Sequence, residues 1–380
     1  MKITISPDSF KGSLSAKQAS NMIEEGCQTV FSKAVCRKIP MADGGEGTVD
    51  ALIYSTNGKR LHYDVTGPLG NTISTFMGES GVNHEALIEV ASVCGLVQVP
   101  ESKRCPLNTT SYGLGELISI ALDEGYRKLL IGLGGSATND GGLGMLQALG
   151  AKFYNYEGDE VGSFGRDLLN VDQVDLQGLD SRLQDCDIKV ASDVENPLCE
   201  ENGASHVFGP QKGATEEVVE QMDVALAHYS TVVETALSKS FANTKGAGAA
   251  GGLGFALMSI GAVITSGAEV IGEVTQLEEQ IRTSDLVITG EGKSDFQTFY
   301  GKAPGYVAKL AKKHDIPCIL ISGAIDDQEG KLRELFLGVF SITNEPMSLA
   351  ECMDNAEKLL LTQTANVVHF YQQLMKAGEM

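Results

Sequence analysis

The chain has 380 residues, of which 42% are hydrophobic and 44 are glycine, and its formal net charge is −21 at pH 7. This length predicts two domains, each large enough to bury its own core. The negative charge argues against nucleic acid or a membrane surface as partner, because both bind through dense Lys and Arg surfaces. The scattered cysteines form no CxxC pair, and the N-terminus starts a strand pattern without a signal peptide, so we expect a cytoplasmic protein.

The N-terminal residues predict two βα units. Apolar residues indicate strands at 2–6 and 34–39, followed by helices at 15–31 and up to about residue 55. A strand followed by a helix is half of a βαβ unit, the building block of a parallel sheet. This part of the chain therefore predicts an open α/β domain.

Both of these predicted strands end in acidic and glycine-rich loops. Asp8, Ser9 and Lys11 follow the first strand, and Asp43 and Glu46 follow the second. Each acid on its own is readily explained as a helix cap or a solvated charge. Their recurrence after successive strands makes them candidates for a site.

The pattern changes in the middle of the chain. Short strands at 61–65, 73–77 and 86–90 are separated by turn residues and predict an antiparallel meander. An uncharged run at 246–268 is long enough to span a bilayer, but its seven glycines favour a buried helix-loop-helix. Further elements are predicted as helices at 112–123 and 216–238 and as strands at 129–131, 152–155 and 188–191.

A glycine-rich loop follows the strand at 129–131. Its glycines allow a tight turn and are expected to leave backbone amides exposed, which suits an anionic or polyol ligand. Ser136, Thr138, Asn139 and Asp140 stand in this loop. We therefore expect it to contact a ligand.

From residue 277 the βα rhythm returns, with strands at 285–289, 318–322 and 338–342 and a broken closing helix at 349–375. Two units at the start and three at the end predict a flavodoxin-like (Rossmann-like) parallel sheet of strand order 2-1-3-4-5. The expected domains are residues 1–60 plus 272–380, and an inserted mixed α/β domain at residues 61–271.

In that strand order the first strand lies beside the third. Ligands of open α/β sheets bind outside the carboxyl ends of the strands where the winding reverses. Asp8 and Lys11 would meet Glu291, Lys293 and Asp295 there, and loops of the inserted domain could close over the same cleft. This cleft is the predicted active site.

Carboxylates, lysines and glycine-rich turns together favour phosphoryl transfer. No GxxxxGK[ST] occurs, which excludes a Walker P-loop, and protein-kinase signatures are missing. Gly132, Gly134 and Ala137 fit a relaxed dinucleotide fingerprint, but no acid follows at the expected spacing. An NAD-dependent hydroxy-acid dehydrogenase and a non-catalytic metabolite-binding protein remain the alternatives.

Seven segments, in order, resemble the glycerate kinases of the bacterial glycerate 2-kinase type, and the similarity runs from end to end. The resemblance implies ATP-dependent phosphorylation of D-glycerate, a requirement for Mg²⁺, and a two-domain fold with the active site between the domains. We expect transfer to the 2-hydroxyl, with the 3-hydroxyl as the alternative. The segments are PDSFKGS (7–13), ADGGEGT (42–48), GGSATNDGG (134–142), NPLCEENGAS (196–205), FGPQKGA (208–214), GAGAAGGLG (246–254) and TGEGKSDFQTFYGKAP (289–304).

Two positions depart from the family pattern. Glu200 stands where a glycine is expected, and Phe296 stands where a small polar residue is usual. Both bear on local loop shape and not on the expected activity. The sequence leaves the oligomeric state open, including a homodimer.

The roles of the individual residues are assigned here from their chemistry. Asp193 ends a predicted strand and is the candidate base for the glycerate hydroxyl, with Asp8 and Asp295 as Mg²⁺ ligands. Lys11 and Lys293 are expected to contact carboxylate or phosphate oxygens. Asp193, Lys11 and Asp8 form the predicted catalytic set. The other predicted binding residues are Ser9, Asp43, Ser136, Thr138, Asn139, Asp140, Lys212 and Glu291.

Overall fold

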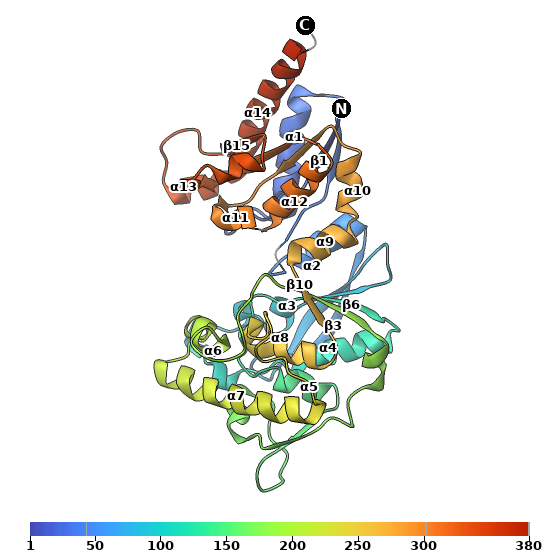
Figure 1. Cartoon of the computed structure of the whole chain (residues 1–380), viewed down its shortest axis with the longest axis vertical. Coiled ribbons are helices and arrows are strands. Elements are labelled where there is room, and N and C mark those ends of the chain that lie inside the picture. Colours follow the sequence, from blue (N-terminus) through green and yellow to red (C-terminus); the bar gives the residue numbers. More distant parts are fainter. Residues whose placement is uncertain (43, 301, 379–380) are drawn as a thin grey trace. The chain divides into compact units, whose positions relative to one another are not determined.

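The computed structural model describes residues 1–42, 44–300 and 302–378 (Figure 1). Unit 1 comprises Met1–Asp43, Asp50–Thr56 and Gly267–Met380, and unit 2 comprises Gly44–Val49 and Asn57–Ser266. Helix α2 (Thr48–Thr56) begins in unit 2 and ends in unit 1. No helix in the described part of the chain is long and apolar enough to cross a membrane.

Unit 1 is built on a parallel sheet of five strands in the order β2-β1-β11-β13-β15. Ile3 of β1 lies opposite Leu286 of β11, so strands from the two ends of the chain share one sheet, as predicted. The expected pairing of the first and third strands is confirmed. The strands are β1 (Lys2–Ile5), β2 (Val35–Lys38), β11 (Leu286–Thr289), β13 (Cys318–Ser322) and β15 (Gly338–Ser341), with a small separate pair β12 (Lys293–Ser294) and β14 (Ala324–Ile325).

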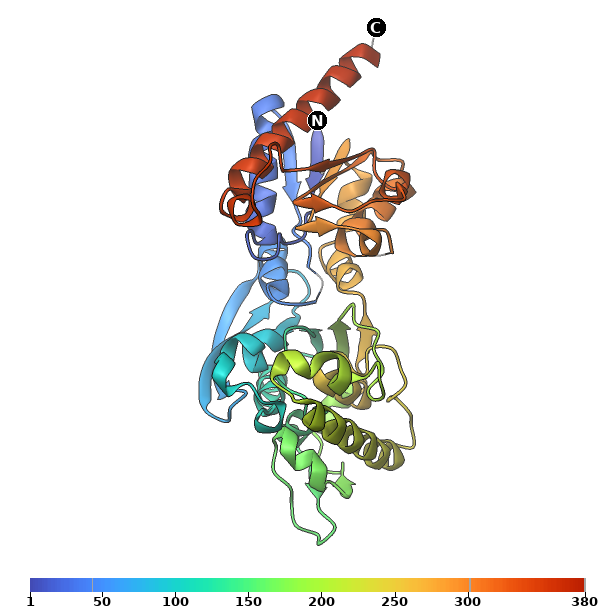
Figure 2. The same cartoon turned by 90° about the vertical axis from the view of Figure 1, so that its left-hand side faces the viewer.

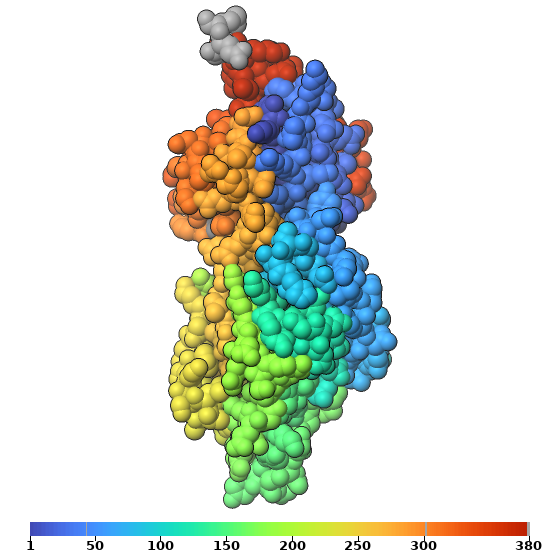
Figure 3. Space-filling model, turned by 90° about the vertical axis from the view of Figure 1, so that its right-hand side faces the viewer, coloured from blue at the N-terminus to red at the C-terminus, as the bar shows by residue number. Residues whose placement is uncertain are grey.

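Helices cover both faces of this sheet (Figure 2), with α1 and α14 on one face and α12 on the other. Helices α1 and α14 pack closely: a Cβ on Gly26 would lie 2.8 Å from the Leu361 carbonyl oxygen. Figure 3 shows α14 in red beside the N-terminal residues in blue. The helices are α1 (Ala16–Val30), α9 (Gly267–Val274), α10 (Leu277–Arg282), α11 (Phe296–Tyr300), α12 (Ala303–Lys313), α13 (Leu349–Asp354) and α14 (Ala356–Gly378).

Local sequence signals explain several helix boundaries of unit 1. Ser15 and Gln18 form a capping box that starts α1, and Ser348 and Glu351 form another at α13. The closing helix is broken at Asn355, as predicted. These side chains satisfy backbone amides that have no partner inside the helix.

Unit 2 contains a mixed sheet of six strands in the order β10-β9-β6-β5-β4-β3. Strands β3, β4 and β5 are antiparallel, as the predicted meander requires, but β5, β6, β9 and β10 run parallel. The four parallel strands therefore place their carboxyl ends side by side. The strands are β3 (Lys59–Thr66), β4 (Thr72–Glu79), β5 (Ala86–Glu89), β6 (Lys128–Gly132), β9 (Asp187–Ala191) and β10 (Val263–Thr265), with a separate antiparallel pair β7 (Lys152–Tyr154) and β8 (Gln173–Asp175).

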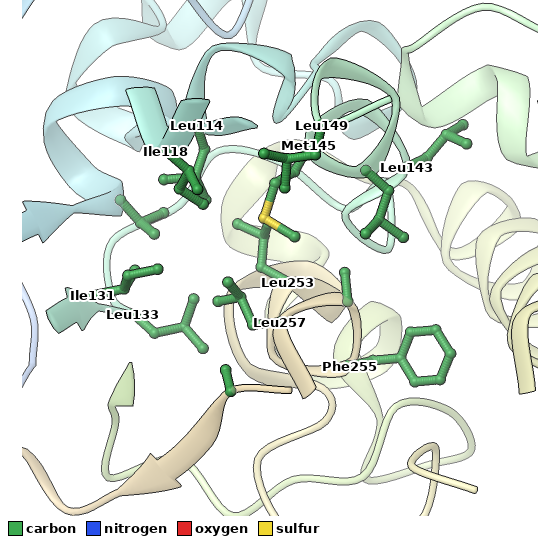
Figure 4. Close-up of a cluster of buried hydrophobic side chains, with 14 of the residues drawn as sticks. Leu114, Ile118, Ile131, Leu133, Leu143, Met145, Leu149, Leu253, Phe255 and Leu257 are labelled. Atoms are coloured by element: carbon green, nitrogen blue, oxygen red, sulfur yellow. The ribbon is translucent and has the colours of Figure 1, made fainter. Parts of the chain in front are cut away.

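The core of unit 2 lies between β6 and three helices (Figure 4). Leu114 and Ile118 of α4 face Ile131 and Leu133, and Leu253 of α8 completes the cluster. Burial of these side chains holds the glycine-rich segments next to them in place. The helices of unit 2 are α3 (Val90–Cys94), α4 (Tyr112–Asp123), α5 (Leu143–Ala148), α6 (Ala204–Phe208), α7 (Glu216–Leu237) and α8 (Ala249–Ser259).

The predicted helix-loop-helix at 246–268 is wrong. Residues 249–259 form α8, but β10 follows at Val263–Thr265, and the next helix starts at Gly267. Three β-branched residues in succession favour a strand there. Within α8, Ala250 and Gly251 have φ of 53° and 73°, so the helix is kinked near its start.

Candidate active site

Three loops meet at the carboxyl end of the unit 1 sheet. The amide of Asp8 donates to the carbonyl of Gly290 at 2.8 Å, which joins the loops after β1 and β11. The amide of Gly323 donates to the carbonyl of Glu291 at 3.0 Å, which joins the loop after β13. The backbone therefore brings together the N-terminal and C-terminal segments that were predicted to meet.

The loop after β1 carries one buried acid and one exposed lysine. Asp8 is 8% exposed, and its Oδ1 accepts a hydrogen bond from the Ser9 amide at 2.6 Å. Lys11 is exposed, next to Gly12 with φ +83°. This loop therefore offers a fixed carboxylate and a solvent-accessible cation within four residues.

The loop after β11 contains Glu291 and Lys293 in contrasting surroundings. Glu291 is buried, and its Oε1 accepts from Ser294 Oγ at 2.9 Å and Thr298 Oγ1 at 2.6 Å. Burial raises the pKa of Glu291 above its ordinary value, although these two hydrogen bonds oppose that shift. Lys293 is exposed, with its Nζ 3.5 Å from Asp326 Oδ2.

The donor set of unit 1 suits a magnesium-bound nucleotide. Asp295 is half-buried, and its Oδ1 accepts from the Gln297 amide at 2.9 Å, while Asp8 offers a second carboxylate. Mg²⁺ is commonly held by one or two carboxylates together with substrate phosphates. Across residues 1–42, 44–300 and 302–378, no group of three or more His, Cys, Asp or Glu side chains could hold a metal. Asp43 lies outside the described residues.

In unit 2, four of the segments that carry the family resemblance pack together. The Gly141 amide donates to the Gly251 carbonyl at 3.0 Å, and Asn139 Nδ2 donates to Ser205 Oγ at 2.9 Å. A Cβ on Gly251 would lie 2.0 Å from the Thr138 carbonyl oxygen, so only glycine fits there. The four segments are residues 134–142, 196–205, 208–214 and 246–254.

Lys212 connects two of these segments from below the surface. It is 2% exposed, and its Nζ donates to Ser136 Oγ at 2.9 Å and to the Thr138 carbonyl at 2.6 Å. Burial lowers the pKa of Lys212 to about 8. Its ammonium group therefore fixes the backbone of the glycine-rich loop.

The polar side chains of the same loop are also buried. Asp140 Oδ2 accepts from the amide and from Oγ of Ser111, both at 2.7 Å, and its Oδ1 accepts from the Gly142 amide at 3.1 Å. Burial raises the pKa of Asp140, with these hydrogen bonds opposing the shift. Thr138 and Asn139 are 0% and 1% exposed. In this conformation, none of these three side chains reaches the surface.

The expectation that this loop leaves its amides exposed is wrong at several positions. The Ala137 amide donates to the Cys94 carbonyl at 2.8 Å, and those of Gly141 and Gly142 are paired as described above. Buried backbone amides require such partners, because an unpaired buried donor is costly. The loop uses its hydrogen-bonding capacity to hold its own shape.

Asp193 is an exposed acid of this region. It stands two residues beyond the end of β9, and the neighbouring Ser192 amide donates to the Thr265 carbonyl at 3.0 Å. Ala191 of β9 lies opposite Gly132 of β6 in the sheet. Asp193 and the glycine-rich loop therefore follow adjacent parallel strands.

Sequence reasoning missed three polar residues of these regions. Asp326 pairs with Lys293, and Ser111 binds the carboxylate of Asp140. Neither has a local signal, because its partner is 33 or 29 residues away. Glu89 is buried at the end of β5. An acid inside the apolar run ALIEV (86–90) was a usable signal for it.

A surface hollow of about 490 Å³ lies elsewhere in unit 2, beside helix α7. Leu169, Val224 and His228 are among the residues that line it. None of its lining residues belongs to the predicted site.

Comparison with known proteins matches residues 3–372 to the Glycerate kinase family. Glycerate 2-kinase of Escherichia coli K12 is 47% identical over 369 residues, covering 97% of each chain. Glycerate kinase of Bacillus subtilis 168 is 46% identical, covering 95% of each chain. A crystal structure from Salmonella typhimurium LT2, provisionally titled glycerate kinase 2, superposes with a TM-score of 0.88 at 44% identity, covering 100% of this chain and 99% of that one.

These matches, together with the α/β architecture and the acid- and lysine-bearing loops, define an enzyme that is a phosphotransferase with an alcohol group as acceptor. The match spans both units. The chain belongs to the Glycerate kinase family, and its function is that of a glycerate kinase.

Proposed function

We propose that the enzyme transfers the terminal phosphoryl group of ATP to the 2-hydroxyl of D-glycerate, giving 2-phosphoglycerate and ADP, with Mg²⁺ as cofactor. The observation that carries this proposal is the family match over nearly the whole chain. The choice of the 2-hydroxyl is supported by the name of the Escherichia coli relative. Transfer to the 3-hydroxyl is the alternative that the experiment below separates.

Asp193 is proposed as the base that accepts the proton of the attacking hydroxyl. It is exposed at the carboxyl end of the unit 2 sheet, where a substrate can reach it without disturbing the core. A carboxylate within hydrogen-bond reach of the hydroxyl both orients it and receives its proton. In a loose transition state proton acceptance matters less, and a carboxylate that only orients the hydroxyl would contribute a smaller factor.

Unit 1 is proposed to contact the nucleotide and its metal. Lys11 and Lys293 are exposed cations that can donate to phosphate oxygens. Asp8 and Asp295 would hold Mg²⁺, which neutralises charge on the phosphate oxygens when bound. Ser9 and Glu291 are proposed to support this loop set, and Asp43 remains a proposed binding residue.

Unit 2 is proposed to hold an anionic group of a substrate with its glycine-rich loop. Ser136, Thr138 and Asn139 remain the proposed binding residues, with Lys212 and Asp140 beneath them. Because all five are buried, their contribution depends on the loop shape that they maintain. Lys212 Nζ donates a hydrogen bond to Ser136 Oγ, so an anionic ligand that bound Ser136 would also be attracted by the charge of Lys212.

We further propose that the chain forms a flavodoxin-like domain from residues 1–60 and 272–380, built on the sheet of unit 1, around an inserted domain at 61–271. The strand order of that sheet supports this classification. A cytoplasmic location and a homodimeric state are proposed with it, and gel filtration with light scattering tests the latter.

A direct assay tests the proposed reaction. Purified protein is incubated with D-glycerate, ATP and Mg²⁺, ADP release is followed, and the product is identified by phosphorus NMR. We expect ADP at a rate that depends on glycerate, a 2-phosphoglycerate signal, and loss of both with excess EDTA. A 3-phosphoglycerate signal would reverse the regiochemistry. Nicotinamide-dependent absorbance changes without ADP would overturn the proposal, as would ligand binding without turnover.

A further inference from the structure

A buried carboxylate that has no assigned role lies at the carboxyl end of the unit 2 sheet. Glu89 is the last residue of β5, is 5% exposed, and lies opposite Gly132 of β6. It precedes helix α3, but its side chain makes no capping hydrogen bond to that helix. Its carboxylate is directed to another part of unit 2.

That part is the start of α2. Glu89 Oε2 accepts a hydrogen bond from the amide of Val49 at 3.2 Å, and Val49 is the second residue of the helix. Amides in the first turn of a helix have no acceptor within the helix, and a negative charge there is favourable. Strand β5 therefore holds the first turn of α2 through this hydrogen bond.

The segment leading into this turn lies in backbone contact with two neighbouring strands. Gly44 has φ +88°, and a Cβ on it would lie 2.2 Å from the Ala191 carbonyl oxygen. A Cβ on Gly132 would lie 2.9 Å from the Gly44 carbonyl oxygen, and one on Gly134 would lie 2.7 Å from Gly45 Cα. Residues 44–49, named here the glycine strap, thus contact the ends of β6 and β9 through the backbone of Gly44 and Gly45.

The glycine strap touches the two elements that carry the unit 2 site residues. Ala191 stands two residues before Asp193, and Gly134 stands two residues before Ser136. Because backbone meets backbone at Gly44 and Gly45, a displacement of the strap there would displace the adjoining backbone of β6 and β9. Misplacement of a reacting group by about 1 Å can cost on the order of 100-fold in rate.

We propose that Glu89 is a positioning residue of the kinase: by holding Val49, it keeps the glycine strap seated on β6 and β9 and so fixes the backbone that carries Asp193 and Ser136. This inference rests on the proposed function of that site. It assigns a role to Gly44 and Gly45 of the ADGGEGT segment, which the chemistry of the reaction leaves unexplained.

The test compares Glu89→Ala with Glu89→Gln, which retains an acceptor oxygen. Glu116→Ala is the matched control, because Glu116 Oε2 accepts from the Thr66 amide at 2.6 Å in the same unit but holds no strap residue. For each variant, kcat and KM per folded molecule are measured with D-glycerate and ATP. Hydrogen–deuterium exchange is measured over residues 44–49 and over Thr66. If Glu89→Ala fails to fold, Glu89→Asp replaces it.

We expect Glu89→Ala to accelerate exchange over residues 44–49 and to lower kcat about 10- to 100-fold, with KM for ATP little changed and Glu89→Gln restoring most of the rate. Glu116→Ala should accelerate exchange at Thr66 and leave kcat within about twofold. Accelerated exchange over residues 44–49 in Glu89→Ala with an unchanged kcat would overturn the inference. A decrease of kcat in Glu89→Gln without faster exchange over residues 44–49 would overturn it as well. If the unaltered enzyme shows no glycerate-dependent turnover, the proposed function fails, whereas the exchange results still decide whether Glu89 anchors the strap.

Discussion

The carboxyl ends of the two parallel sheet regions carry lysines in opposite environments. In unit 1, Lys11 and Lys293 are exposed, and Lys293 has its Nζ near Asp326 at the surface. In unit 2, Lys212 is 2% exposed, and Asp140 is completely buried. A lysine or an acid in a glycine-rich loop is therefore not by itself a ligand contact.

The difference follows from the cost of desolvation. An exposed ammonium keeps its hydration until a ligand replaces it, so it remains available for binding. A buried ammonium must be satisfied within the protein, and Lys212 meets this need through Ser136 and Thr138. Substitutions at exposed positions should change catalysis with little effect on stability. Substitutions at buried positions should change catalysis and stability together.

The largest expected effect is that of Asp193→Asn on catalysis. The amide keeps the size of the side chain but cannot accept the hydroxyl proton, so kcat should fall about 10²- to 10⁴-fold. Glycerate binding and the melting temperature should stay nearly unchanged, because Asp193 is exposed. Steady-state kinetics and thermal denaturation measure the two quantities.

Two results would revise the role of Asp193. A decrease of only about tenfold would indicate that the carboxylate orients the hydroxyl and is not its base. Activity restored by raised Mg²⁺ would make Asp193 a metal ligand, and Asp8 or Asp295 the next candidate base. Glu195→Gln, an exposed acid two residues further along, is the control and should keep kcat.

The burial of Lys212 should make the free energy of unfolding depend on pH. Its pKa falls from 10.5 in the unfolded chain to about 8 in the folded protein, so the unfolded state binds more protons between these values. Relative to Lys212→Met, the free energy of unfolding should therefore rise by up to about 3 kcal/mol as the pH increases from 8 to 10.5. Urea denaturation across this range measures the difference. If the free energy of unfolding changed with pH in the same way in both proteins, the result would contradict a buried ammonium.

Lys11→Met should weaken catalysis and leave the fold intact. Loss of a charged hydrogen bond to an anionic ligand is worth roughly 1.5 to 3 kcal/mol, which predicts a decrease in kcat/KM of about 10- to 150-fold. Lys293→Met is the matching test on the neighbouring strand end. Lys313→Met, which breaks an exposed pair with Glu278, is the control and should keep full activity. Unchanged kcat/KM for both substrates would remove Lys11 from the site.

The smallest expected effect is that of Glu200→Gly. Glu200 has φ +72°, in the left-handed region that favours glycine, and glycine is the residue that the family resemblance leads us to expect there. The substitution should raise the free energy of unfolding by about 1 kcal/mol without changing kcat. Glu201→Gly, at an adjacent exposed residue outside that region, should be neutral or destabilising. A loss of stability in Glu200→Gly would show that the Glu200 side chain makes a compensating contact.

Much of the topology could be predicted because it depends on local periodicity and a simple adjacency rule. The pairing of Ile3 with Leu286 follows from counting βα units at the two ends of the chain. Burial of the glycine-rich loop could not be predicted, because it depends on Lys212, 76 residues away in sequence from Ser136. Strand β10 was missed because the glycines before it dominated the pattern, although Val263–Thr265 carries its own strand signal.

The parallel pairing of β1 with β11 also bears on how the chain folds during synthesis. The two strands lie 283 residues apart, as the hydrogen bond from Thr289 Oγ1 to the Ser6 carbonyl shows. At about 5 to 20 residues per second, β1 leaves the ribosome roughly 15 to 60 s before its partner. All of the strands of unit 2 emerge within that interval. Nascent chains from which the first 275 residues have emerged should therefore show a protease-resistant unit 2 while β1 and β2 are still cleaved. Early protection of β1 would require a temporary partner for that strand.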